Sequence, residues 1–178
     1  WTPGSKHETY TELRACIRRI VIRALFGDDM GERADEFGDH LEEPLRYINR
    51  PPWTRFDHEW PGMPYRRAMT SRRAADAIVF DEIERRRSLP DLGDRVDLLS
   101  SLLAARDEDA LTDVELRDQV VSLIAAGYDT TTAAASWMVH FLATNPTAWH
   151  ELRREVCDSG GDTVLNAAEL QRMPWLNG

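Results

Sequence analysis

The sequence predicts an all-α protein whose helical core surrounds one long central helix, at about residues 112–144. No run of alternating β-branched residues is long enough to predict a strand. Apolar residues recur instead at helical spacing, in segments that proline and glycine separate. One of these segments continues for about 33 residues without a helix stop, which corresponds to roughly 50 Å at 1.5 Å per residue.

Four helices are expected before the central one. Leu13, Ile17 and Leu25 share a face of the first helix, and Gly27 closes it. The same spacing predicts the next three helices at about Glu32–Ile48, Arg66–Arg87 and Asp97–Arg106.

The basic third helix ends in three consecutive arginines, Arg85, Arg86 and Arg87. Cations are favourable near a helix C-terminus, so the triplet is interpreted as a solvated helix end. Before this helix comes a long connection from Pro51 to Pro64 that proline and glycine punctuate. Long connections of this kind are typical of lids over binding sites.

Local signals predict both ends of the central helix. Thr112 and Glu115 have the spacing of a capping box, in which each side chain binds a backbone N–H group of the first turn. Asn145 ends the helix, because the residue before a proline disfavours helical geometry. Pro146 suits the first turn of the next helix, which is predicted to reach about Val156.

The composition is that of an ordinary globular protein, with 42% hydrophobic and 30% charged residues. Residues 1–178, which include one more short helix at about Asn166–Met173, are expected to form a single partial domain.

The net charge of −9 argues against a nucleic-acid partner, because phosphate contacts need a basic face. Lys6 is the only lysine, and no P-loop signature surrounds it. Cys16 and Cys157 are too few for a disulfide framework, so a reducing compartment is expected. The acidic, arginine-rich character of the chain indicates a cytoplasmic location.

The central helix is apolar on nearly all sides. From Gln119 to His150, Asp129 is the only acidic residue, and neither lysine nor arginine occurs. A helix of this kind lies inside a protein or a membrane. A charged residue at the bilayer centre costs about 2.5–3.5 kcal/mol, so a central core helix is the favoured interpretation.

One stripe along this helix is bulky at both ends and small in its middle. Its members are spaced by three or four residues: Leu116, Val120, Leu123, Gly127, Thr130, Ala134, Trp137 and Phe141. The small residues Gly127, Thr130 and Ala134 leave a notch, which a close-packed core does not leave empty. Gly127, Asp129 and the neighbouring threonines cost the helix roughly 3–4 kcal/mol relative to alanine. A local cost of this kind is expected at a functional site.

Two interpretations of Asp129 and Thr130 follow from these positions. A carboxylate beside a hydroxyl near a cavity can act as a proton relay. Alternatively, a crossing helix fills the notch, each threonine hydroxyl bonds back to the carbonyl four residues earlier, and Asp129 pairs with an arginine. The spacing by itself leaves both interpretations open and favours the second.

The string Ala126-Gly127-Tyr128-Asp129-Thr130-Thr131 resembles the central-helix pattern of the cytochrome P-450 family, Ala/Gly-Gly-x-Asp/Glu-Thr-Thr/Ser. Other segments resemble the same family in the right order, and the resemblance covers essentially the whole chain. These segments are Leu25-Phe26-Gly27, Asp97–Leu103, Asn145-Pro146 with Leu152–Val156, and Leu170–Leu176. The resemblance implies an internal fragment of a haem-thiolate monooxygenase.

In that family the central helix passes over one face of the haem. The resemblance implies that Ala126, Gly127 and Thr131 contact the cofactor. It implies that Leu123 and Ala126 contact the substrate, and that the segment from Pro51 to Pro64 belongs to the lid of the substrate channel.

The resemblance makes Asp129 and Thr130 the catalytic residues. They would deliver the protons that promote cleavage of the O–O bond, with O2 as co-substrate. The implied partners are a small apolar organic substrate and an electron-donor redox protein, either a ferredoxin or a flavoprotein reductase.

Two motifs of the family are absent. The cysteine motif Phe-x-x-Gly-x-x-x-Cys-x-Gly fails, because Glu12 and Arg153 stand four residues before Cys16 and Cys157 in place of glycine. The axial cysteine is therefore expected outside this chain, and no residue of the chain is expected to bind the iron. The Glu-x-x-Arg pair is expected just beyond Gly178. The isolated chain is not expected to hydroxylate a substrate by itself.

The missing cysteine also supports a rival interpretation, in which the chain is a non-catalytic helical remnant or partner-binding module without haem. A di-iron carboxylate bundle is a third interpretation, and it needs Glu-x-x-His pairs. None of the five histidines has a glutamate three residues before it, which argues against that chemistry.

Overall fold

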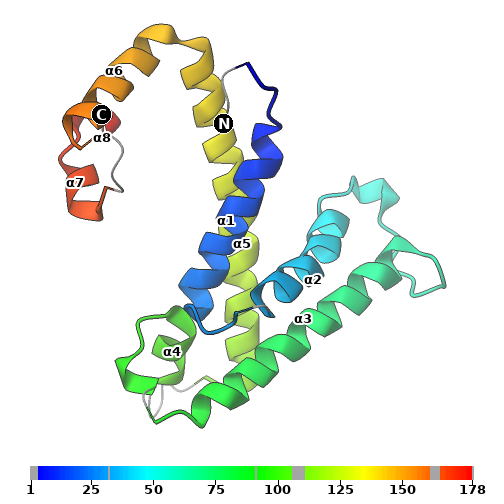
Figure 1. Cartoon of the computed structure of the whole chain (residues 1–178). Helices are drawn as coiled ribbons and strands as arrows, with labels where there is room; N and C mark the ends of the chain where they lie inside the picture. The colour runs from blue at the N-terminus through cyan, green and yellow to red at the C-terminus, as the bar shows by residue number, and fades with distance from the viewer. Residues whose placement is uncertain (1–3, 32, 91, 106–110, 161–164, 178) are drawn as a thin grey trace. The chain divides into compact units, whose positions relative to one another are not determined.

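The computed structural model of this protein describes residues 4–31, 33–90, 92–105, 111–160 and 165–177. These residues form helices and turns without a strand among them, so the all-α prediction is confirmed (Figure 1). Contacts group the chain into two compact units, unit 1 at Trp1–Thr132 and unit 2 at Ala133–Gly178, and each is described by itself. The single partial domain expected from the sequence stays a prediction.

Each helix predicted from the sequence is present. In chain order the helices are α1 Thr9–Phe26, α2 Arg33–Ile48, α3 Pro64–Arg87, α4 Leu98–Leu103, α5 Asp113–Thr144, α6 Pro146–Asp158, α7 Ala167–Gln171 and α8 Pro174–Asn177. Two short 3-10 helices, η1 Pro52–Thr54 and η2 Leu92–Asp94, lie in the connections, and neither they nor α8 were predicted. The predicted helix ends at Glu32 and Arg106 lie outside the described residues.

The helix ends follow local chemistry. Gly27 ends α1 with a positive φ of 68°, a conformation that glycine adopts without a steric cost, and its N–H donates to the carbonyl of Arg23 at 2.7 Å. At the start of α5, the Thr112 N–H donates to Glu115 Oε2 at 2.8 Å, and the Glu115 N–H donates to Thr112 Oγ1 at 3.3 Å. The predicted capping box is therefore confirmed.

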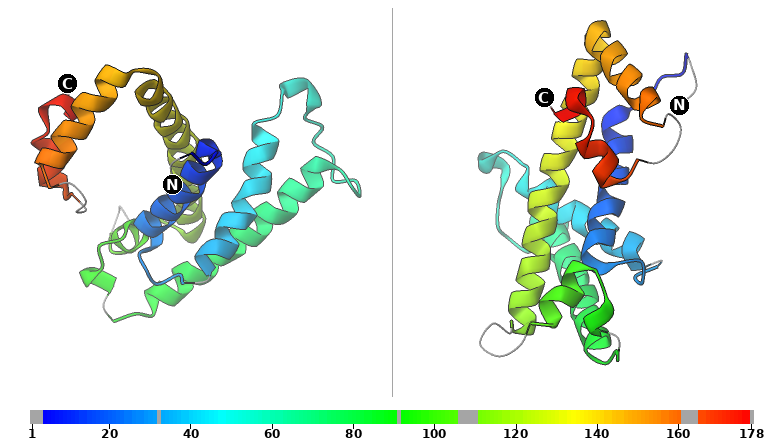
Figure 2. Two further views of the ribbon diagram at one scale, coloured as in Figure 1. Left: turned by 45° about the horizontal axis from the view of Figure 1, so that its top comes forward. Right: turned by 90° about the vertical axis from the view of Figure 1, so that its left-hand side faces the viewer.

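In unit 1, α2 and α3 run side by side in opposite directions, as the views in Figures 1 and 2 agree. The rings of Phe26 and Phe37 meet edge to face, with their centroids 5.4 Å apart. From α5, Leu116 and Val120 are fully buried. The first two residues of the predicted stripe therefore belong to the core of unit 1, because apolar area removed from water stabilises the folded chain.

Arg86 contradicts the interpretation of the arginine triplet as a solvated helix end. Its side chain is 0% exposed, and its Nε donates to Glu82 Oε1 at 2.6 Å. Its Nη1 donates to Asp97 Oδ1 and, at 2.6 Å, to Ser100 Oγ, while its Nη2 donates to the carbonyl of Phe26. Arg86 thus joins α1, α3 and α4 through one buried guanidinium, because this group offers five donors in a fixed fork.

The two carboxyl groups bound to Arg86 stay ionised despite their burial. Burial by itself would raise the pKa of Glu82, but hydrogen bonds from Arg85 and Arg86 outweigh it and hold that pKa below its ordinary value. Burial also acts to raise the pKa of Asp97, and the hydrogen bonds from Ser100 and Arg86 lower it. The contribution of this network to the stability of the folded chain therefore depends on both carboxylates being charged.

In unit 2, α6 and α8 are joined through one carboxylate. Glu155 of α6 accepts hydrogen bonds from the backbone N–H groups of Trp175 and Leu176, at 2.8 and 3.0 Å. These N–H groups belong to the first turn of α8, where no partner exists within the helix. Among the residues that the structure describes, no helix is both long and apolar enough to cross a membrane.

Candidate functional site

The central motif lies within α5, in the part of that helix that belongs to unit 1. Leu123, Ala126, Gly127, Thr130 and Thr131 share one side of the helix, because residues three, four and seven apart lie on the same face. We call these five residues the open face. The structure thus brings together on one side every predicted cofactor-contacting and substrate-contacting residue, together with Thr130.

The open face has little cover in the described part of the chain. Leu123 is 41% exposed, and Ala126, Thr130 and Thr131 are also exposed. A Cβ atom added to Gly127 would meet no neighbouring heavy atom within 4 Å. The crossing helix of the alternative interpretation is therefore not found here among the described residues.

The Thr130 hydroxyl donates a hydrogen bond to the carbonyl of Ala126, four residues earlier. Thr132 behaves in the same way, because its Oγ1 donates to the carbonyl of Tyr128 at 2.8 Å. This part of the alternative interpretation is therefore correct for Thr130 and Thr132. The bond uses the hydroxyl proton of Thr130 and leaves the oxygen able to accept a hydrogen bond on the open face.

Asp129 lies beside the open face, and its carboxylate contacts two residues that precede α5 in the chain. Asn49 Nδ2 donates to Asp129 Oδ2 at 2.8 Å, and Arg14 Nη2 lies 3.5 Å from Asp129 Oδ1. The arginine partner that the sequence suggested is therefore present. Among the described residues, no hydrogen bond joins the Asp129 carboxylate to the Thr130 hydroxyl.

A second carboxylate, Glu42 of α2, completes the contacts behind the motif. Tyr128 is 2% exposed, and its hydroxyl donates to Glu42 Oε1 at 2.8 Å. Burial first, and then the bond to Glu42, raise the pKa of Tyr128 to about 12. Arg14 lies over the Tyr128 ring, 4.9 Å from its centroid, and 3.2 Å from Glu42 Oε2. Helices α1, α2 and α5 are therefore joined directly behind the motif.

Sequence reasoning did not identify Arg14, Glu42 or Asn49 as part of this site. Its one signal was Asp129 itself, since a lone carboxylate in an apolar helix needs a partner inside a fold. Nearly every basic residue of the chain is an arginine, so this requirement did not single out Arg14.

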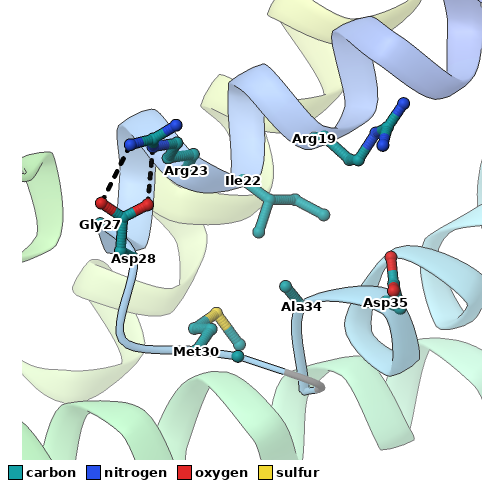
Figure 3. Close-up of a pocket in the computed structure, with 9 residues that line it drawn as sticks. Arg19, Ile22, Arg23, Gly27, Asp28, Met30, Ala34 and Asp35 are labelled. Atoms are coloured by element: carbon teal, nitrogen blue, oxygen red, sulfur yellow. Dashed lines mark hydrogen bonds and ion pairs between the residues drawn. The ribbon is translucent and has the colours of Figure 1, made fainter.

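A separate pocket of about 230 Å³ lies between α1 and the start of α2 (Figure 3). Ile22, Met30 and Ala34 supply its apolar surface, and an ion pair between Arg23 and Asp28 borders it, with Arg23 Nε 2.7 Å from Asp28 Oδ1. No residue of α5 lines this pocket, so the sequence motif does not point to it.

Comparison with known proteins decides the family. A family profile described as Cytochrome P-450 matches residues 3–178. The chain belongs to the cytochrome P-450 family.

Two relatives of this cytochrome P-450 chain come from mycobacteria. The Mycobacterium bovis protein named "Putative cytochrome P-450 139" is 34% identical over 181 residues, which cover 100% of this chain and 42% of the relative. "Putative cytochrome P-450 135A1" of Mycobacterium tuberculosis is 33% identical over 179 residues, which cover 96% of this chain and 38% of the relative. The chain therefore spans less than half the length of these relatives.

Solved cytochrome P-450 structures share the fold. "Retinoic acid bound cyanobacterial CYP120A1" superposes with a TM-score of 0.78 at 24% identity, covering 94% of this chain and 37% of that one. A crystal structure of CYP102L1 superposes with a TM-score of 0.75 at 24% identity, covering 96% of this chain and 41% of that one. At this identity the likeness shows the fold.

Cytochromes P-450 are haem monooxygenases that use O2, and the open face fits a flat cofactor. A planar ligand needs a helix surface without protruding side chains, and the empty space beside Gly127 together with the short side chain of Ala126 provides one. Cys16 and Cys157 are exposed thiols outside any disulfide. The axial cysteine outside the chain stays a prediction.

Proposed function

We propose that the protein containing this chain activates O2 at a haem and hydroxylates a small apolar organic substrate. Ala126, Gly127 and Thr131 contact the haem in this proposal, and Leu123 and Ala126 contact the substrate. The observation that carries the proposal is the open face, which none of the described residues covers at the family motif and beside which a Cβ at Gly127 would meet open space. A bound haem supplies the oxygen chemistry, with a thiolate ligand from outside this chain.

Thr130 is one half of the proposed proton-delivery pair. In this structure its hydroxyl proton is bound to the carbonyl of Ala126. The hydroxyl must therefore rotate away from that carbonyl before its oxygen accepts a proton from one neighbour and its own proton passes to another. A residue with both capacities at the edge of an apolar site can relay protons without carrying a charge.

Asp129 is the other half of the pair. It is the only carboxylate between Gln119 and His150, and its side chain is 27% exposed, so it can exchange protons with water. It must turn away from Asn49 and Arg14 to reach Thr130, because no hydrogen bond links the two residues in this structure. The proposed relay therefore includes a rotation of the Asp129 side chain.

The substrate and partners of the whole protein are part of the same proposal. The exposed apolar surface of Leu123 suits an apolar substrate. A ferredoxin or a flavoprotein reductase supplies the electrons, and the location is cytoplasmic.

The test uses the complete, haem-loaded protein and compares Thr130→Ala with Thr144→Ala. Thr144 also donates its hydroxyl to a carbonyl four residues earlier, His140, at 2.9 Å, and it lies at the far end of α5 from the capping box. Both variants should give the carbon monoxide difference spectrum of a thiolate-bound haem. Only Thr130→Ala should lower the product formed per O2 consumed, by on the order of 10²-fold, with hydrogen peroxide in its place.

Two results would contradict the proposal. If the unmodified protein binds no haem, the open face holds something else. If Thr130→Ala and Thr144→Ala form equal amounts of product per O2, then Thr130 does not deliver protons.

A further inference from the structure

The chain is acidic as a whole, but one segment of it is strongly basic. Between Glu43 and Asp76 it holds seven arginines, no lysine and two carboxylates, so these residues carry +5 while the whole chain carries −9. We call residues 44–75 the basic segment. It runs from the end of α2 through η1 into the first half of α3. Figures 1 and 2 show no helix of unit 1 except α2 and α3 beside the connection that contains η1.

The arginines of the basic segment keep much of their charge available to a partner. Among the described residues, no carboxylate forms an ion pair with Arg50, Arg55 or Arg66. The other four arginines form ion pairs, but their side chains are exposed. Exposed ion pairs contribute little to stability, so these four can also exchange their carboxylate for one on a partner.

Two of the arginines line a hollow of about 340 Å³ at the start of α3. Its lining residues are Glu43, Gly62, Arg66, Arg67, Thr70 and Ser71. Glu43 Oε1 lies 3.4 Å from Arg67 Nη2, whereas no described carboxylate pairs with Arg66. A guanidinium offers a planar fork of donors that matches a carboxylate, and the two hydroxyl groups can donate as well. The hollow therefore suits a carboxylate side chain from outside.

Large aromatic side chains stand among these arginines. Trp53, Phe56 and Trp60 are 79, 60 and 68% exposed. Tryptophan and arginine are the residue types that contribute most to protein–protein binding, because each combines a large contact area with hydrogen-bond donors. The composition of the basic segment is therefore typical of the centre of a protein interface.

The connection that carries the aromatic residues is tied to both flanking helices. From α2, the Tyr47 hydroxyl donates to Asp57 Oδ1 at 2.8 Å. From α3, Arg73 Nη2 donates to Glu59 Oε1 at 2.5 Å. These bonds occupy both carboxylates of the basic segment, so neither is left to repel an acidic partner. They also hold the surface in one shape, which lowers the entropy that binding costs.

The spacing of the aromatic residues favours a protein over a lipid surface as the partner. Two polar residues separate Trp53 from Phe56, and three separate Phe56 from Trp60. A helix that lies in a membrane surface needs a continuous apolar face, and η1 has only three residues. Single aromatic anchors among arginines instead fit the pockets and carboxylates of a folded partner.

We propose that the basic segment is a docking surface for an acidic protein. Carboxylates of the partner pair with Arg50, Arg55 and Arg66, and its apolar residues pack on Trp53 and Trp60. This inference goes beyond the proposed function, since no residue of the basic segment belongs to the open face. Charge complementarity selects the partner, because a surface of +5 attracts an acidic protein and repels a basic one.

The test measures peptide binding by the complete, haem-loaded protein. The probe is a fluorescein-labelled amphipathic helix of about 20 residues that carries leucine on one face and glutamate on the other. Its control has glutamine in place of every glutamate. One variant combines Arg50→Gln, Arg55→Gln and Arg66→Gln, and a second carries Trp53→Ala. The dissociation constant is measured by fluorescence anisotropy at low and at high salt.

A matched variant removes the same charge elsewhere on the chain. It combines Arg23→Gln, Arg87→Gln and Arg154→Gln, whose side chains are exposed and lie outside the basic segment. A further probe is a vesicle of equal parts phosphatidylcholine and phosphatidylglycerol, whose binding is followed by sedimentation. It tests whether any anionic surface binds the basic segment in place of a protein.

The unmodified protein should bind the glutamate peptide, and 1 M salt should abolish the binding because it screens charges beyond about 3 Å. The triple variant in the basic segment and Trp53→Ala should each weaken binding by about tenfold. The matched variant and the vesicle should show no such effect: the first should bind the peptide like the unmodified protein, and the second should not bind.

Three results would overturn the inference. Equal binding of the glutamate and glutamine peptides, or binding of neither, would show that the basic segment does not select acidic partners. Equal losses in the two triple variants would show that net charge, and not this surface, governs binding. Sedimentation with the vesicles that the basic-segment variants abolish would assign the surface to an anionic membrane.

Discussion

Replacing Arg86 by leucine tests the buried network that joins α1, α3 and α4. The substitution removes every hydrogen bond that the guanidinium makes to Glu82, Asp97, Ser100 and the carbonyl of Phe26. It leaves two carboxylates inside the protein without their shared cation. Loss of one partner of a buried ion pair costs about 3–5 kcal/mol of unfolding free energy.

The remaining contacts place the expected cost within that range. Glu82 keeps Arg85, whose Nε and Nη2 lie 2.9 and 2.7 Å from its oxygens. Asp97 keeps the hydrogen bonds from Ser100, and Arg95 Nε lies 3.4 Å from its Oδ2. Because both carboxylates keep partial partners, we expect Arg86→Leu to cost about 3 kcal/mol, at the lower end of the range.

The neighbouring Arg87 supplies a matched control. Its side chain is 48% exposed, and its Nη2 lies 2.6 Å from Asp113 Oδ1. An exposed ion pair contributes about 0–1 kcal/mol, so Arg87→Leu should be nearly neutral. The assay is the urea dependence of unfolding of the complete haem-loaded protein. Equal losses in Arg86→Leu and Arg87→Leu would refute the assignment of Arg86 to a buried network.

Three further predictions concern the site, the pH dependence and the start of α5. Gly127→Leu should abolish the haem spectrum while the chain stays folded, because the added Cβ meets no neighbouring heavy atom within 4 Å among the described residues and leucine favours a helix by up to about 1 kcal/mol. A retained spectrum would contradict the fit of haem to the open face. Glu82 and Asp97 have lowered pKa values, so the stability they contribute is present above their unfolded pKa values of about 4 and is lost as the pH falls through the folded ones. Urea midpoints measured between pH 6 and 3 should show this loss, and Glu82→Gln should make the loss smaller. Thr112→Ala removes half of the capping box and should cost about 1 kcal/mol in the same assay, whereas an unchanged midpoint would show that this helix end contributes nothing.

The sequence by itself determined α1 to α7 and the motif. The start of α5 follows from Thr112 and Glu115, and its end follows from Asn145 before Pro146, because capping and proline geometry act over a few residues. The family motif was readable for a similar reason, since six consecutive residues carry it. The small side chains that leave the open face could also be read from helical spacing.

Only the tertiary structure decided which polar groups meet. Asn49 lies 80 residues before Asp129 in the chain, and no local rule pairs them. Arg86 occupies a helix end that local reasoning assigns to solvent, but α1 and α4 cover it and supply acceptors from Phe26, Asp97 and Ser100. Burial and long-range pairing depend on how helices pack against one another, and a buried charge is stable only where such partners converge.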